Sequence, residues 1–296
     1  EAAGDYNSDS KTYSLYLKQS NAKAPDAPAL MMPINMGLVG MSGNQINLNV
    51  DGKELGTSTT LVFDKKEQKF EFTNVEEDVV PSLLREFSAP VKLNCGYSED
   101  NLLHLMANDS DEFNRYQATQ ELFLSHLLKM VKAKSVDVDE RLTAAFTTVL
   151  NGAKATPAVT ALTLSLPSEA KIAQEMECVD VDAIYAARKA MCEKFAKINR
   201  KALESTYKFC QGTDPKSISP DNVGKRSLMN LCLAYLASDD DKFAENLAKA
   251  QFDGARNMTE ERAALHVLIN SSSPHKDSAI SSHYTKWENE DLVINA

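Results

Sequence analysis

The sequence predicts a multidomain β + α protein, in which a small β-sandwich precedes an all-α superhelical, solenoid-like array of antiparallel helices. Apolar and polar residues alternate in short segments of the first third of the chain, as in half-buried strands. Beyond Ser98 the apolar residues recur at steps of three and four, the period of an amphipathic helix. The 296 residues are enough for two domains. We therefore assign residues 1–92 to the sandwich and residues 93–296 to the helical domain.

Four segments of the first domain alternate as strands do. They are Tyr13, Leu15 and Leu17; Ile46, Leu48 and Val50; Leu61 and Phe63; and Phe70 and Phe72. The polar segment Lys65–Gln68 separates the last two and predicts a β-hairpin. Pro25, Pro28 and Pro33 surround the apolar run Leu30–Met32. Because proline cannot donate to a sheet, that strand is predicted to start late or to lie at an edge.

Helices are predicted through the second domain from their caps and apolar stripes. Ser98 caps one helix, and Ser219 followed by Pro220 begins another in the preferred order. Further helices are expected from Thr259 and toward Trp287. The main stripes are Phe113, Tyr116, Phe123, Leu127 and Val131; Ile184, Ala187, Met191, Phe195, Ile198 and Ala202; Leu228, Leu231, Cys232 and Tyr235; and Phe243, Leu247 and Ala250. The breaks between helices are short, which makes neighbouring helices antiparallel and predicts the solenoid-like array.

Charge and hydropathy exclude two classes of partner. The formal net charge is −10, whereas a nucleic-acid-binding surface needs clustered lysine and arginine. No apolar run reaches the length that spans a bilayer. We therefore expect neither nucleic acid nor membrane as a partner.

The N-terminal residues and the cysteines bear on where the protein is located in the cell. Residues 1–5 have neither a basic nor an apolar signal-peptide region, and no initiator Met precedes them, so the chain is expected to begin inside a longer protein. The five cysteines are widely spaced and form no Cys-x-x-Cys pair. Free thiols indicate a reducing compartment, and we expect a cytoplasmic protein, or an organellar one if a transit peptide was lost upstream.

The sequence holds no zinc-binding helix. Its histidines are His104, His126, His266, His275 and His283. No two of them are four residues apart, and the His-Glu-x-x-His motif is absent. His104 and His266 interrupt apolar stripes and are interpreted as core or boundary residues. We attribute the spacing of His275 and His283, near Asp277, to chance.

No nucleophile or phosphate-binding motif is present either. Cys192 and Cys232 fall on apolar helix faces, which predicts buried and unreactive thiols. Gly37, Gly40 and Gly43 are spaced three apart but precede no helix, so they are interpreted as a loop and not as a nucleotide site. The acidic clusters Glu76–Asp78, Asp137–Glu140 and Asp239–Asp241 are interpreted as solvated turns and helix caps. We expect no catalytic, cofactor-binding or metal-ligating residue in this chain.

Several segments, in the same order along the chain, resemble aminopeptidase N of the type found in bacteria, plants and apicomplexan parasites. These segments are Met32–Leu38, Phe70–Val75, Val80–Val91, Asp109–Arg115, Arg226–Asn230, Asn257–Thr259, Lys286–Trp287 and Leu292–Ile294. The segment Val80–Val91 is the most distinctive, and the matches run nearly from end to end. The resemblance covers only the family's β-sandwich and most of its C-terminal helical domain.

The resemblance implies the non-catalytic C-terminal portion of a zinc metallopeptidase that removes N-terminal residues from peptides. The family's zinc helix, its Gly-x-Met-Glu-Asn motif and its catalytic tyrosine all lie upstream of the matched region, so zinc would be bound outside this chain. The implied partners are the upstream zinc catalytic domain and the peptide substrates. The helical domain, which would be truncated here, covers that catalytic domain and helps to gate peptide access, and the sandwich is a spacer.

Two alternatives remain open at the level of sequence. One is a free-standing interaction module that binds a partner on a concave helical face. The other is a catalytically dead paralogue. A reading frame that extends upstream into a His-Glu-x-x-His helix supports the peptidase, an initiator Met just before Glu1 supports the interaction module, and broken zinc ligands upstream support the paralogue.

Overall fold

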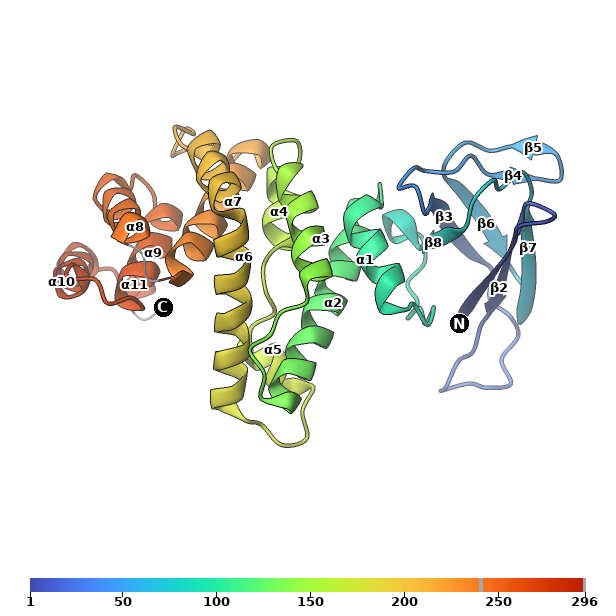
Figure 1. Cartoon of the computed structure of the whole chain (residues 1–296), viewed down its shortest axis with the longest axis horizontal. Coiled ribbons are helices and arrows are strands. Elements are labelled where there is room, and N and C mark those ends of the chain that lie inside the picture. Colours follow the sequence, from blue (N-terminus) through green and yellow to red (C-terminus); the bar gives the residue numbers. More distant parts are fainter. Residues whose placement is uncertain (240–241, 295–296) are drawn as a thin grey trace. The chain divides into compact units, whose positions relative to one another are not determined.

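The computed structural model describes residues 1–239 and 242–294, and the chain forms two compact units, Glu1–Phe123 and Leu124–Ala296 (Figure 1). The first unit contains all the strands in the described residues together with the first helix and part of the second. The second unit is helical. This order of strands followed by helices confirms the predicted fold class.

Two antiparallel sheets and a small two-stranded ribbon form the β part of the first unit (Figure 1). The first sheet has the order β1-β2-β7, with β1 Ala2–Asn7, β2 Thr12–Lys18 and β7 Glu67–Phe72. The second has the order β6-β3-β8, with β6 Thr59–Phe63, β3 Met32–Gly40 and β8 Val79–Leu83. The ribbon pairs β4 Asn49–Val50 with β5 Lys53–Glu54. One apolar core joins the sheets, and its fully buried members include Leu15, Phe72, Met36, Leu38 and Leu48. The alternating residues of both sheets therefore meet as in a sandwich.

The predicted hairpin between Leu61–Phe63 and Phe70–Phe72 is wrong. Strand β6 pairs with β3, where Leu61 lies opposite Ile34, whereas β7 pairs with β2, where Phe70 lies opposite Leu15. The turn between them thus crosses from one sheet to the other. Alternation tells which side chains are buried, but two strands that bury the same core from opposite sheets alternate just as a hairpin does.

Other strand predictions are confirmed in part. The strand after the prolines starts late, at Met32, but it is the central strand of its sheet and not an edge. A strand was predicted over Ile46–Val50, but only β4 is a strand there. The residues before β4 form isolated hydrogen bonds: the N–H of Ile46 donates to the carbonyl of Leu38, and that of Leu48 donates to the carbonyl of Gly56. Strand β1 had no sequence signal.

Two helices follow the sandwich: α1 Glu99–Asn108 and α2 Glu112–Ala133, which continues into the second unit. Ser98 caps α1 as predicted, since its hydroxyl accepts the N–H of Asn101 at 3.1 Å and the Asn101 side chain accepts the N–H of Ser98 at 3.1 Å. This reciprocal capping box satisfies two backbone donors that a helix start would leave unpaired.

The second unit is an array of helices joined by short breaks. In chain order they are α3 Glu140–Asn151, α4 Pro157–Thr163, α5 Glu169–Gln174, α6 Val181–Cys210, α7 Pro220–Leu236, the 3-10 turn η2 Ala237–Asp239, α8 Lys242–Gly254, α9 Met258–Ile269, α10 Lys276–Trp287 and α11 Asp291–Ile294. Successive long helices pack on one another, α6 on α7, α8 on α9 and α9 on α10. None of the described helices is both long and apolar enough to cross a membrane.

An aromatic cluster forms the core where α3, α6 and α7 meet. The ring of Phe146 stacks on Phe195 with centroids 4.3 Å apart and meets Tyr235 edge-on at 5.2 Å. The hydroxyl of Tyr235 donates to the carbonyl of Leu164 at 2.6 Å, so this buried ring also satisfies its polar end.

The predicted apolar faces of two helices need correction. On α8 the buried residues are Ala244, Ala248 and Gln251, whereas the predicted Phe243 is 40% exposed. Ile198 on α6 is likewise exposed. The small alanines let α8 approach its neighbour closely, and a stripe of small residues is a weaker sequence signal than one of large residues. Of the acidic cluster Asp239–Asp241, the last two residues lie outside the described part of the chain.

Candidate functional site

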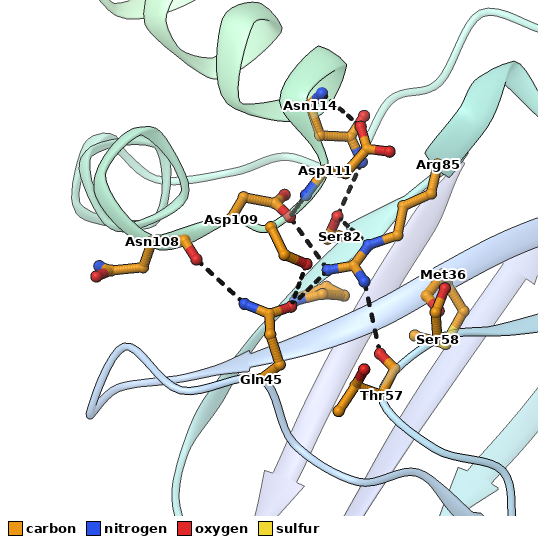
Figure 2. A network of polar contacts seen from close by, with 12 residues as sticks. Met36, Gln45, Thr57, Ser58, Ser82, Arg85, Asn108, Asp109, Asp111 and Asn114 are labelled. Carbon is orange, nitrogen blue, oxygen red and sulfur yellow. Dashed lines mark hydrogen bonds and ion pairs between the residues drawn. The ribbon is translucent and has the colours of Figure 1, made fainter. Parts of the chain in front are cut away.

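The most elaborate polar site of the first unit is built around Arg85 (Figure 2). Strand β8 ends at Leu83, and Leu84, Glu86 and Phe87 all adopt left-handed backbone angles, with φ of 59°, 55° and 56°. Such angles are uncommon outside glycine and cost energy. They bend the chain so sharply that the Arg85 side chain, only 5% exposed, enters the interior.

Every arm of the Arg85 guanidinium has an acceptor. Nε donates to the hydroxyl of Ser82 at 2.8 Å, and Nη1 donates to the carbonyl of Thr57 at 3.5 Å. Nη2 donates to Gln45 Oε1 at 2.9 Å and pairs with Asp109 Oδ1 at 3.1 Å. Figure 2 shows these partners converging on the guanidinium from β8, from loops of the sandwich and from the end of α1.

Asp109 is the counter-charge of Arg85, and it is the residue at which α1 ends. Its side chain is fully buried, and Oδ1 also accepts the N–H of Asp111 at 2.9 Å. Burial raises the pKa of Asp109 above its ordinary value, although the Ser82 hydroxyl, the Asp111 N–H and the Arg85 guanidinium favour the ionised form. The effect of burial on the pKa of Asp109 is therefore larger than the opposite effect of its hydrogen-bond and charge partners.

The start of α2 is tied to the same site. Asn114 donates its amide to Ser82 Oγ at 2.8 Å and to the carbonyl of Leu83 at 2.9 Å. The Asp111 carboxylate caps α2 by accepting the Asn114 N–H at 2.8 Å, and it also accepts the N–H of Glu86 at 3.3 Å. Both helices that follow the sandwich are therefore anchored to its last strand by side-chain hydrogen bonds.

Two segments on which the family resemblance rests meet here. Val80–Val91 supplies Ser82 and Arg85, and Asp109–Arg115 supplies Asp109 and Asn114. No sequence pattern predicted this ion pair. A lone arginine in a strand-rich segment and an aspartate at a helix end are each ordinary, and nothing in the sequence shows that they meet. The Arg85 guanidinium is fully paired, whereas Asp109 Oδ2 is buried without a hydrogen-bond partner. The arrangement can therefore hold the surrounding elements in position.

The glycines interpreted as a loop belong to this region. Gly37 and Gly40 lie on β3 and only Gly43 lies in a turn, with φ of +87°, so the loop interpretation is wrong for the first two. A Cβ on Gly37 would meet the Arg85 guanidinium, and one on Gly40 would meet the Glu77 carboxyl at 2.6 Å. Here glycine makes room for side chains packed on the strand.

A second polar cluster lies in the helical unit, where α10 packs on α9. Glu261 is 3% exposed and accepts three donors from α10: His283 Nδ1 at 2.8 Å, Lys286 Nζ at 2.5 Å and Trp287 Nε1 at 2.9 Å. Burial raises the pKa of Glu261, but the three donors outweigh it and leave the pKa below the ordinary value. This cluster holds α10 in place.

Three of the five histidines make separate pairwise contacts. His104 Nε2 lies 2.9 Å from the Gly40 carbonyl, His283 contacts Glu261, and His275 lies 3.9 Å from Glu245. His266 is exposed, so its interpretation as a core or boundary residue is wrong. None of the contacts of His104, His275 and His283 supplies the three or four nitrogen, sulfur or oxygen ligands that zinc requires.

Of the two thiols on apolar helix faces, Cys232 is buried as predicted, whereas Cys192 is only half-buried. Burial raises the pKa of Cys192 to about 11 and that of Cys232 to about 12. All five cysteines are free. A thiol with so high a pKa is almost wholly protonated at neutral pH and is a poor nucleophile.

An immunoglobulin-like sandwich followed by helical repeats is also what comparison with known proteins finds. Residues 1–96 match the family described as "Domain of unknown function (DUF3458) Ig-like fold", and residues 99–296 match the family described as "Domain of unknown function (DUF3458_C) ARM repeats". The chain belongs to this DUF3458_C family. The first family match ends at residue 96 and the second begins at residue 99, whereas the two compact units meet between residues 123 and 124. The domain boundary between residues 92 and 93 stays a prediction.

The relatives with curated names are aminopeptidases. Aminopeptidase N of Escherichia coli strain K12 is 30% identical over 98% of this chain, and that of Haemophilus influenzae is 29% identical over 98%. The crystal structure of Legionella pneumophila aminopeptidase A in complex with aspartic acid superposes with a TM-score of 0.76 at 26% identity and covers 98% of this chain. The resemblance to aminopeptidase N is therefore confirmed. The chain spans 34% of the length of each of these three proteins and corresponds to the C-terminal portion of aminopeptidase N.

Proposed function

We propose that this chain is the non-catalytic C-terminal part of a zinc-dependent aminopeptidase, a hydrolase that removes N-terminal residues from peptides. The observation that carries the proposal is the alignment of 98% of this chain with 34% of aminopeptidase N. Zinc, bound by the rest of the parent enzyme, would supply an activated water for attack on the peptide bond. No residue of this chain takes part in that step.

The helical unit would cover the catalytic domain and restrict the access of peptides, and the sandwich would act as a spacer. An enclosed chamber excludes water and large substrates, which limits an enzyme to short peptides. Rigid elements suit this role, and the Arg85 and Glu261 sites each join neighbouring elements through a buried carboxylate and its donors. The partners would be the upstream catalytic domain and peptide substrates. Free cysteines favour a reducing, cytoplasmic location.

A reconstitution assay tests this function. The purified chain is assayed for hydrolysis of a fluorogenic aminoacyl amide, first alone and then mixed with the separately expressed upstream part of the parent enzyme. We expect no activity from the chain alone and zinc-dependent activity on mixing, abolished by a chelator. A matched control mixes the upstream part with an unrelated helical-repeat protein.

Each outcome has a distinct meaning. Activity of the chain alone would show that a catalytic site lies within these residues. If the mixture shows no hydrolysis although the upstream part is folded and loaded with zinc, the proposed role is refuted. That result would favour an interaction module or a catalytically dead paralogue.

A further inference from the structure

A cavity of about 200 Å³ opens in the helical unit where the end of α6 and the loop after it meet α7, α8 and α9. Its lining combines polar residues, among them Tyr207, Glu260 and Arg256, with the apolar Met229 and Leu247. None of these residues takes part in the Arg85 or Glu261 sites.

Glu260 is the feature that points to a ligand. It lies in the first turn of α9, where its backbone N–H is capped by Asn257 Oδ1 at 2.9 Å. The residue is only 9% exposed, yet within residues 1–239 and 242–294 its carboxylate has no hydrogen-bond or salt-bridge partner. A carboxylate that keeps little contact with water and has no cation beside it favours a cationic group inside the cavity.

Arg256 is the second charged residue of the lining. It is exposed, and its Nη2 donates to the carbonyl of Thr213 at 3.4 Å, which holds the guanidinium beside the cavity. Among the described residues Arg256 makes no ion pair, with Glu260 or with any other carboxylate. The cavity is therefore lined by one negative residue, Glu260, and one positive residue, Arg256, and the two do not pair with each other.

Two uncharged polar residues of the lining, Tyr207 and Gln251, are already paired. Tyr207 donates its hydroxyl to Gln251 Oε1 at 2.8 Å, and Gln251 Nε2 donates to Asn230 Oδ1 at 2.9 Å and to the carbonyl of Glu260 at 3.0 Å. This network spans α6, α7, α8 and α9, so the wall is rigid. Glu260 and Arg256 are the two charged residues of the lining that a ligand would contact.

We propose that this cavity binds a free α-amino acid with an apolar side chain. The ammonium group pairs with the Glu260 carboxylate, the carboxylate pairs with Arg256, and the side chain lies against Met229 and Leu247. A simple cation would satisfy Glu260 but meet repulsion from Arg256, and a simple anion would meet the reverse. A zwitterion neutralises both, and charged hydrogen bonds of this kind are the strong ones. The inference concerns this chain alone and does not depend on the proposed peptidase function.

The test is calorimetric titration of the intact chain with L-leucine. Two analogues that need no mutation accompany it: isopentylamine, which lacks the carboxylate, and 4-methylpentanoate, which lacks the ammonium group. We expect saturable binding of L-leucine and affinities at least tenfold weaker for both analogues. No saturable heat with L-leucine, or equal affinity for either analogue, would overturn the proposal.

Four variants assign the binding to the two charges. Glu260→Gln and Arg256→Gln keep the size of the side chain and are each expected to weaken L-leucine binding at least tenfold. Glu121→Gln and Arg262→Gln, at exposed positions away from the cavity, are the matched controls and should bind as the parent chain does. Circular dichroism verifies folding. If both cavity variants fold and bind L-leucine as tightly as their controls, the site lies elsewhere and the proposal fails.

Discussion

A Cβ atom on Gly37 would lie 2.2 Å from Nη1 and 2.3 Å from Cζ of Arg85, so the buried guanidinium occupies the space that any larger residue at position 37 would need. Gly37 belongs to the central strand β3, and Arg85 belongs to the ion pair that anchors α1 and α2. The two fit together only because Gly37 has a hydrogen atom where other residues have a side chain. Because Arg85 is held by four acceptors, it cannot move aside without losing hydrogen bonds.

Gly37→Ala is therefore expected to destabilise the protein by about 1–3 kcal/mol, the usual cost of overpacking. Denaturant unfolding, followed by circular dichroism, measures the change. Gly254→Ala is the matched control, because nothing lies within 4 Å of a Cβ at that position. In an Arg85→Ala background the added cost of Gly37→Ala should fall. Equal stability of Gly37→Ala and Gly254→Ala would contradict this coupling.

Asp109→Asn leaves the buried Arg85 guanidinium without its counter-charge. Breaking a buried ion pair from one side typically costs about 3–5 kcal/mol, whereas replacing both partners by apolar groups costs much less. We expect the double variant Arg85→Met, Asp109→Leu to be less destabilised than the sum of the single variants. A double-mutant cycle by urea denaturation measures the coupling. A coupling energy near zero would show that the pair is not a unit.

Glu261 makes the stability depend on pH in the acid range. Its pKa in the folded protein lies below the ordinary value of 4.5, so the folded state binds fewer protons than the unfolded state in that window. The contribution of Glu261 is fully present above pH 4.5 and is lost as the pH falls through the folded pKa.

Glu261→Gln should lower the unfolding free energy at neutral pH by about 1–3 kcal/mol, because three donors from α10 lose a charged acceptor. It should also flatten the loss of stability in the acid range. Thermal unfolding at several pH values checks both effects, with the exposed Glu288→Gln as control. A pH profile with the same acid slope in both variants would argue against this assignment.

The thiols should differ sharply in reactivity. Cys178 is exposed, whereas burial raises the pKa of Cys210 to about 11 and that of Cys232 to about 12. Titration of the folded chain with a disulfide reagent at neutral pH should label Cys178 rapidly and the buried thiols slowly. Cys178→Ser should remove the fast phase, and guanidinium should expose all five cysteines. Rapid labelling of Cys232 in the folded chain would refute its burial.

The candidate sites were predictable only in part. Apolar spacing correctly predicted that Cys232 is buried but overestimated the burial of Cys192, and a capping motif placed Ser98 at the start of α1. The pair Arg85 and Asp109 lies 24 residues apart, and its members lie on different elements. Such a contact depends on the path of the chain between them, and here that path includes Glu86 and Phe87 in left-handed conformations that no local pattern predicts.

The sequence by itself determined the two kinds of secondary structure, their order along the chain, the caps of the helices that start after Ser98 and Ser219, and the family. These follow from local periodicity, capping residues and breaks, which act over a few residues. The tertiary structure alone decided that β6 and β7 lie in opposite sheets, that α8 buries its alanines, and that Arg85 shares its space with Gly37. These choices depend on which surfaces fit together, because packing and the pairing of buried charges involve residues distant in the sequence.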